Sequence, residues 1–178
     1  IKDYPNIYNH LKDYKDKLKS RYQYNKEIPY WNWVFLRNYS TFIKDEDKIF
    51  VPCKERISHK NHYRFSYIEP GNFPTQDATA ITLKENTQES IFYILAFLNL
   101  PIVFDWLKVK GVIKGSIVEF SAKPLKSLPF RAIDFNNSNE TYIYQQIISL
   151  SKEMVLNKNL NNIGKINNLF NTLLECDY

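Results

Sequence analysis

The sequence predicts an α+β fold: a twisted, mostly antiparallel sheet packed on a buried central helix, with an N-terminal helix and a C-terminal helical hairpin. Three observations predict it. Residues 91–100 are apolar around the whole helical circumference, which is typical of a buried helix. Short β-branched and aromatic segments between residues 30 and 120 are separated by turn residues. Apolar stripes with helical spacing occur at both ends of the 178-residue chain.

The central helix has a clear start and a clear interruption. Ser90 is a candidate N-cap, since its hydroxyl can accept a hydrogen bond from an amide group of the first turn. Thr87 and Gln88 are alternative caps one turn earlier. Pro101 interrupts the apolar run, so the run is too short to cross a membrane.

The other elements follow the same rules in chain order. A first helix opens at Pro5 and is expected to end near Arg21. Its apolar stripe consists of Ile7, Leu11, Tyr14 and Leu18. Strands are expected at residues 30–36, 49–51, 64–68, 78–83 and 117–120, and a tight corner at 124–129.

Two further helical stripes follow a polar linker at residues 134–139 and form the expected hairpin. They consist of Ile143, Ile147, Leu150 and Met154, and of Ile163, Ile166, Leu169, Phe170 and Leu173. We therefore expect a main domain, with the N-terminal helix, at 1–135 and a helical hairpin at 136–178.

Composition limits the class of protein. The net charge is +5, and such a basic chain suits a polyanionic partner. Cys53 and Cys176 are the only cysteines, which favours a reducing compartment, and the sequence shows neither a signal peptide nor a transmembrane segment. We expect a cytoplasmic protein without a membrane partner. Because the chain starts at Ile1 and enters a helix directly, we expect a fragment of a longer protein.

Catalytic and cofactor patterns are weak. The four glycines form no Gly-rich loop after a strand, so we expect no nucleotide cofactor in this fragment. Cys53, His59 and His62 fit no standard zinc spacing. Glu46 and Lys48 form an E-x-K element of the kind that metal-dependent nucleases use, although such triplets are common by chance. Asp77 is better explained as a turn cap. We therefore expect a non-catalytic binding module without a metal site.

A basic stretch at residues 54–64 is the first candidate binding surface. It is either a solvated loop or a nucleic-acid edge, in which cations hold phosphates and other side chains reach bases. Its candidate DNA-binding residues are Lys54, Arg56, His59, Lys60, His62 and Arg64.

The order of segments resembles a known family. Six short motifs, in this order, carry the resemblance. The first three are Tyr4-Pro5-Asn6-Ile7 with the first stripe, residues 33–37 ending in Leu36-Arg37, and Lys48-Ile49-Phe50-Val51-Pro52. The last three are Leu95-Ala96-Phe97-Leu98-Asn99, Gly115 to Phe120 with Leu125, Leu128 and Pro129, and Ile166 with Leu169, Phe170 and Leu173. Together they cover almost the whole chain. They resemble the TaqI-like C-terminal specificity (target recognition) domain of adenine-N6 DNA methyltransferases, including those in single-chain type II restriction–modification enzymes.

The sequence departs from that family's pattern at two places. Leu100-Pro101 stands where a serine and a continuing helix are usual, and Leu174-Glu175-Cys176 replaces Tyr-Gly-Leu. The Asn-Pro-Pro-Tyr methyltransferase signature is absent from this sequence. The resemblance therefore implies that a catalytic domain lies upstream, in the same longer chain.

The resemblance also implies a mechanism. The upstream domain of a bacterial restriction–modification enzyme would bind S-adenosylmethionine, flip the target adenine and methylate it, while this fragment reads double-stranded DNA. The fragment's further candidate contacts are Lys108, Lys110, Lys114 and Ser116, with Arg37 as a weaker choice. Two alternatives remain open: a protein-interaction domain that uses the C-terminal helices, and a small metal-dependent nuclease.

Overall fold

The computed structural model describes residues 1, 3–23, 26–32, 34, 43–52, 54–58, 64–72, 78–120, 122–158 and 160–175. They belong to two compact units, Ile1–Tyr39 and Ser40–Tyr178, which are described separately below as unit 1 and unit 2. Helices and small antiparallel sheets occur together, so the predicted α+β class is confirmed. The functional boundary expected after residue 135 stays a prediction.

Where the sequence predicted one helix at the start of unit 1, the described residues 5–19 form two short ones. The helix α1 (Pro5–Lys12) carries Pro5 in its first turn, and α2 (Lys15–Lys19) follows after a break at Asp13 and Tyr14. Ile7 on α1 is 52% exposed and Tyr14 is 50% exposed, whereas Leu11 and Leu18 are half-buried, so the predicted apolar stripe is only partly covered in this unit.

The strand expected at residues 30–36 is not formed where the structure describes it. Tyr30, Trp31 and Asn32 lie in a turn, and Val34 lies in a bend. The guanidinium of Arg21 donates hydrogen bonds to the carbonyls of Pro29, Tyr30 and Asn32, which bends this segment back on itself. The remaining positions of the expected strand, with Arg37, lie outside the described residues.

The described residues of unit 2 form two separate three-stranded sheets, where the sequence predicted one. In the first, β1 (Lys48–Pro52) lies between β3 (Ser66–Ile68) and β4 (Ala78–Ile81), and both pairings are antiparallel. Ile49 of β1 stands opposite Tyr67 and Ile81, and the side chains of Ile49 and Val51 are fully buried.

The central helix α4 (Ile91–Leu98) is confirmed as the core of unit 2. The Ser90 hydroxyl accepts a hydrogen bond from the amide of Phe92, so the predicted cap is confirmed over its alternatives. Pro101 does not end helical structure: it opens α5 (Pro101–Lys110), because proline fits a first turn. No single helix in the described ranges is long and apolar enough to cross a membrane; only α4 and α5 pass such a test, as a pair bent by 66°.

The second sheet joins one strand from before α4 with the two strands that follow α5. Its strands are β2 (Lys54–Arg56), β6 (Ile117–Glu119) in the middle, and β5 (Val112–Lys114). The helix α6 (Ala122–Lys126) comes next, at the start of the stretch where the sequence predicted a tight corner. Pro124 is compatible with that helix because it lies in the first turn, where its missing N–H group has no helical acceptor.

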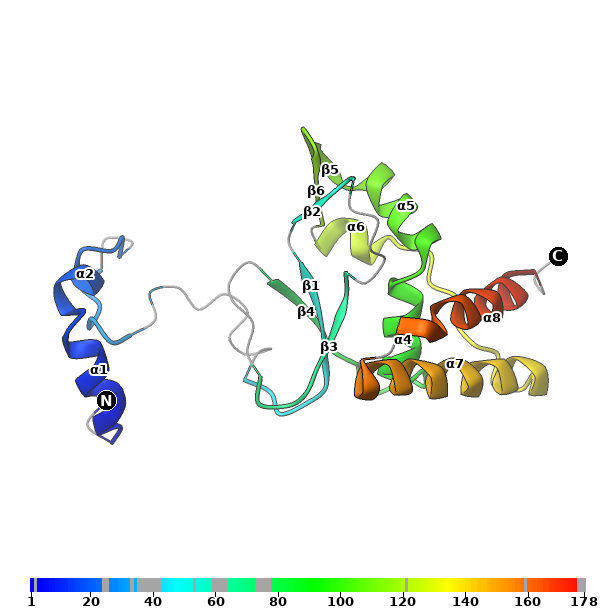
Figure 1. The fold of residues 1–178 in the computed structure, drawn as a ribbon, viewed down its shortest axis with the longest axis horizontal. Helices are drawn as coiled ribbons and strands as arrows, with labels where there is room; N and C mark the ends of the chain where they lie inside the picture. Colours follow the sequence, from blue (N-terminus) through cyan, green and yellow to red (C-terminus); the bar gives the residue numbers. More distant parts are fainter. Residues whose placement is uncertain are drawn as a thin grey trace. The chain divides into compact units, whose positions relative to one another are not determined.

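The C-terminal hairpin is confirmed. It consists of α7 (Ser138–Asn157), a 3₁₀ turn η1 (Leu160–Asn162) and α8 (Ile163–Glu175). The helix α7 packs along α4, and α8 packs against α7 (Figure 1). Tyr93 of α4 holds the three helices together, since its ring lies 5.2 Å from the rings of both Tyr144 and Phe170.

Candidate nucleic-acid interface

The second sheet brings together the two basic segments that the sequence predicted separately. β6 pairs on one side with β2, placing Lys54 opposite Glu119 and Arg56 opposite Ile117. It pairs on the other side with β5, placing Lys114 opposite Ile117. Because side chains alternate between the two faces of a strand, Lys54, Arg56, Lys114 and Glu119 share one face. We call these four residues the basic face.

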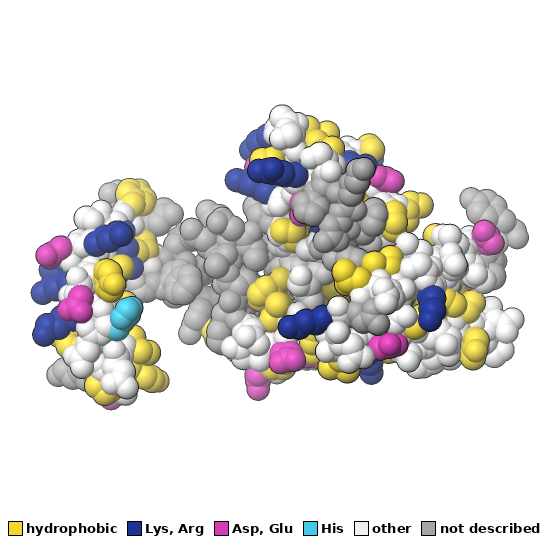
Figure 2. Space-filling view, in the orientation of Figure 1, with side chains coloured by type: hydrophobic (Ala, Val, Ile, Leu, Met, Phe, Trp, Pro, Cys, Tyr) yellow, Lys and Arg dark blue, Asp and Glu magenta, His cyan; other side chains and the backbone are white. Residues whose placement is uncertain are grey.

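The cations of the basic face extend into solvent. The side chains of Lys54 and Lys114 are 61% and 65% exposed, and Arg56 is also exposed. Figure 2 shows Lys and Arg side chains gathering over the part of unit 2 that holds β2, β5 and β6. Three cations and one carboxylate on one face of a sheet leave a net positive surface, which suits phosphate groups.

Glu119 lies between two of these cations. Its Oε2 is 3.0 Å from the Nζ of Lys114, and its Oε1 is 4.0 Å from the Nζ of Lys54. The glutamate side chain is 25% exposed, much less than either lysine. The carboxylate therefore draws the two ammonium groups toward the middle strand while all three groups remain accessible to water.

The hairpin between β5 and β6 turns at Gly115 and Ser116. Gly115 has φ +62°, a conformation that glycine adopts without steric cost. The carbonyl of Ser116 accepts a hydrogen bond of 2.9 Å from the amide of Ile57, which extends the pairing of the sheet beyond β2. Ser116 is exposed at the tip, beside the basic face.

The two lysines at the end of α5 differ in their surroundings. Lys108 is 33% exposed; its ammonium lies 2.5 Å from Asp105 and 5.0 Å from the centre of the Phe104 ring. Lys110 is exposed and lies one residue before Gly111, where α5 passes into β5. Of the two, Lys110 is the better placed for a solution polyanion.

Arg64 does not lie at the surface where the sequence placed it. It is 6% exposed, and its guanidinium carbon lies 3.3 Å from the centre of the Phe104 ring. Its amide donates a hydrogen bond to the side chain of Asn99, and burial lowers the pKa of its guanidinium. The prediction of a phosphate contact at Arg64 is therefore corrected: this arginine packs against the end of α4 and against α5.

Several predicted positions lie outside the described residues, namely Arg37, Cys53, His59, Lys60, His62 and Asp77. Their expected roles stay predictions. Among the residues that the structure does describe, no group of three or more His, Cys, Asp or Glu side chains is placed to hold a metal ion.

Lys48, of the E-x-K element, has a structural role. It is fully buried, and its ammonium donates hydrogen bonds of 2.5 and 2.8 Å to the backbone carbonyls of Lys44 and Glu46. The Glu46 carboxylate lies 3.7 Å from the ammonium of Lys44 instead. Lys48 thus closes the turn before β1, because its ammonium group donates hydrogen bonds to two backbone carbonyls of that turn.

Sequence reasoning missed Glu119, and it also missed Lys123 and Lys126, which are exposed on α6. The signal for Glu119 was present: period-two alternation from Ile117 places it on the face opposite to the buried Val118. What the sequence lacked was the pairing partner, because the Lys-Glu-Arg of β2 has no apolar alternation of its own.

We predict that Gly111→Ala lowers the free energy of unfolding by about 1–3 kcal/mol, a typical cost of overpacking. A Cβ at this position would lie 2.7 Å from the Leu107 carbonyl oxygen, 2.7 Å from the side chain of Val118 and 3.0 Å from the Glu119 carbonyl oxygen. The measurement is urea denaturation followed by circular dichroism. Gly164→Ala is the control: outside its own helix backbone and chain neighbours nothing lies within 4 Å of the added Cβ, so we expect a change of no more than about 0.5 kcal/mol.

Comparison with known proteins gives the chain a context. No protein-family model matches it. It is 51% identical over 164 residues to the type II methyltransferase M.HindII of Haemophilus influenzae, covering 92% of this chain and 32% of that protein. The chain is similar to type II methyltransferases. M.HincII, also from Haemophilus influenzae, is again 51% identical over 164 residues, with 33% of its length covered. M.MjaIV of Methanocaldococcus jannaschii is 32% identical over 126 residues, which are 70% of this chain and 40% of that protein.

This chain spans about a third of the length of the Haemophilus relatives that it matches. The match to these methyltransferases extends over nearly all of both units, since only a small part of the chain lies outside the 164 aligned residues. The basic face therefore has to be understood as part of a segment that type II methyltransferases also possess.

Proposed function

We propose that this chain is a double-stranded DNA recognition module of a type II restriction–modification methyltransferase. The observation that carries the proposal is the second sheet, which unites Lys54 and Arg56 with Lys114, about sixty residues further along the chain. Exposed cations on one face of a sheet are suited to gripping phosphates. The similarity to type II methyltransferases supports DNA as the polyanion.

The finer assignment is that of a TaqI-like target recognition domain acting with an adenine-N6 methyltransferase domain elsewhere in a longer chain. The duplex would lie between the two domains. The basic face, with Ser116 and Lys110, would hold the backbone here, while the other domain flips and methylates the adenine. His59, Lys60 and His62 belong to the same proposal through their place in the sequence after β2.

The cofactor is proposed to bind outside this chain, because its glycines do not fit a cofactor cradle. Gly71 and Gly115 have positive φ in turns, and Gly111 is packed against Leu107 and Val118. Gly164 lies in α8. An S-adenosylmethionine site of the usual kind needs a Gly-rich loop between a strand and a helix. Methyl transfer chemistry would therefore be supplied by the other domain.

The competing use of the hairpin as a docking arm is disfavoured by its packing. Ile147, Met154, Ile166, Phe170 and Leu173 of the two stripes are buried inside unit 2. These side chains already form part of the core with α4, so they are not available to a partner without unfolding the hairpin. Self-association through these two stripes would require such rearrangement.

The test is the salt dependence of DNA binding by the chain with Lys54, Arg56 and Lys114 all replaced by Gln. Fluorescence anisotropy with a mixed-sequence duplex gives log K against log salt concentration. We expect the slope to become shallower by about 0.9 for each phosphate contact that is lost.

The matched control replaces Lys84, Lys152 and Lys165, which are exposed elsewhere in unit 2, by Gln. This control removes the same three positive charges as the first variant, and it should leave the slope of log K against log salt concentration nearly unchanged. Equal slopes in the two triple variants would contradict the basic face as the phosphate-binding surface.

A further inference from the structure

We propose that Glu119 determines specificity by accepting a hydrogen bond from the N4 amino group of a cytosine in the major groove. This inference rests on the proposed DNA-binding function. Among the described residues, Glu119 is the only carboxylate that β2, β5 and β6 place on the basic face. It occupies the middle strand of that face, between Lys54 and Lys114.

A carboxylate in this position opposes simple phosphate binding. Phosphates that approach Lys54 and Lys114 also approach Glu119, since its oxygens lie 4.0 and 3.0 Å from the two ammonium groups. Like charges brought together at an interface cost affinity and suppress wrong partners. The groups on DNA that match a carboxylate are the amino donors of base edges, and cytosine N4 is the usual partner of Glu.

The shape of the hairpin agrees with this role. The major groove admits a two-stranded β-ribbon. β5 and β6 form the hairpin on the open side of the three-stranded sheet, with β2 on the other side of β6, so this hairpin is the part of the sheet that can enter the groove. On β5, Val112 is 53% exposed and Ile113 is 56% exposed, so no other described part of the chain covers the edge strand. Glu119 lies directly opposite Val112 in this pairing.

In the protein without DNA, Lys54 and Lys114 are the ion-pair partners of Glu119. Without DNA they hold the Glu119 carboxylate in place and offset its charge. When the ribbon enters the groove, both flexible ammonium groups can turn to the phosphates on either side, and the carboxylate then faces the base edges. An incorrect base leaves Glu119 without a donor, and the lost hydrogen bond discriminates against that sequence.

The experiment selects preferred duplexes from a random-sequence pool with the unaltered chain and with Glu119→Gln. We expect the unaltered chain to prefer cytosine at one position, and the Gln variant to prefer adenine there, because a glutamine amide pairs with adenine N6 and N7. Replacing that cytosine pair in the preferred duplex should weaken binding of the unaltered chain at least about fivefold. The Gln variant should lose this preference while its binding to the unselected pool is equal or tighter.

Glu55→Gln is the matched control. Glu55 stands opposite Val118 on β6, so it points to the other face of the sheet and its replacement should leave the selected sequence unchanged. An unchanged sequence with Glu119→Gln, or binding without any sequence preference, would overturn the role of Glu119 and leave DNA binding intact. Absence of salt-dependent binding by the unaltered chain would overturn the proposed function, and this inference with it.

Discussion

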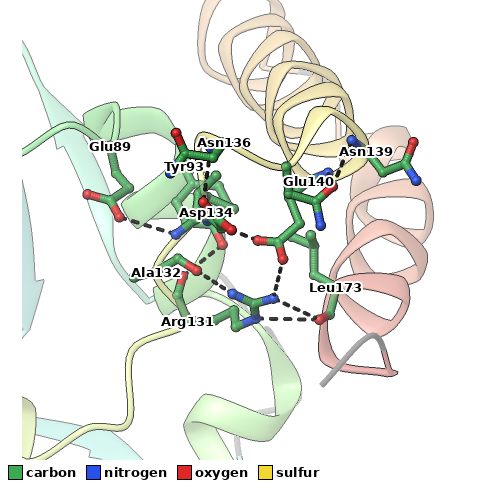
Figure 3. A network of polar contacts seen from close by, with 11 residues as sticks. Glu89, Tyr93, Arg131, Ala132, Asp134, Asn136, Asn139, Glu140 and Leu173 are labelled. Carbon is green, nitrogen blue, oxygen red and sulfur yellow. Dashed lines mark hydrogen bonds and ion pairs between the residues drawn. The ribbon is translucent and has the colours of Figure 1, made fainter. Parts of the chain in front are cut away.

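Replacement of Glu140 by Ala is expected to lower the free energy of unfolding by about 3–5 kcal/mol, the cost of removing one partner of a buried ion pair. Glu140 lies in the first turn of α7 and is 8% exposed. Its Oε1 lies 3.1 Å from Nη2 of Arg131, and its Oε2 accepts a hydrogen bond of 3.0 Å from the amide of Asp134 (Figure 3).

The effect should be large because Arg131 also joins other parts of unit 2. Its guanidinium donates to the carbonyl of Leu173 in α8 and to that of Ala132, while its own carbonyl accepts from the Tyr93 hydroxyl of α4. Without Glu140, the charge on Arg131 would lose this ion-pair partner in a site where its side chain is only 15% exposed. The same substitution frees the amide of Asp134.

Urea denaturation of Glu140→Ala followed by circular dichroism measures the effect. Asp105→Ala is the control, because it breaks an ion pair with Lys108 in which the aspartate is 67% exposed. Exposed pairs contribute about 0–1 kcal/mol, so the control should stay in that range. A double variant, Arg131→Met with Glu140→Leu, should recover most of the lost stability, since no charge is left buried. A loss for Glu140→Ala as small as that of the control would show that water compensates at this site.

The parts of this fold that could be predicted from sequence are those set by local periodicity. Residues 91–98 are apolar on all sides, and α4 is buried on nearly all of them. The Ser90 cap and the two C-terminal stripes were equally local signals. The α5 helix was missed because Pro101 was taken as an end, although proline both ends one helix and starts the next.

Contacts between distant residues were beyond sequence reasoning. Arg131 and Glu140 are nine positions apart across a polar linker, and nothing in that linker indicates a buried pair. Arg64 was taken as exposed because its neighbours are polar, whereas Phe104, forty residues later, provides the surface that covers it. The basic face was predicted only in part: its three cations were named, but only strand pairing shows that they share a face with each other and with Glu119.

Asn99→Ala is expected to lower the free energy of unfolding by about 2–4 kcal/mol, because it leaves buried backbone groups without partners. The side-chain oxygen of Asn99 accepts from the amides of Arg64 and Phe65, at 2.9 and 3.1 Å. Its amide nitrogen donates to the carbonyls of Phe65 and Leu95, at 3.0 Å each. Arg64 and Phe65 are 6% and 4% exposed, so water cannot readily replace these bonds.

The position-specific measurement is hydrogen exchange of the Arg64 and Phe65 amides, which should accelerate more than the amides of α7. Asn168→Ala on the exposed side of α8 is the control and should change stability by no more than about 0.5 kcal/mol. Because Asn99 fixes residues 64 and 65 to the end of α4, it also fixes where the basic stretch after β2 returns to the core. Unchanged exchange at both amides in Asn99→Ala would mean that β1 and β3 hold this segment by themselves, and the assigned role of Asn99 would then be wrong.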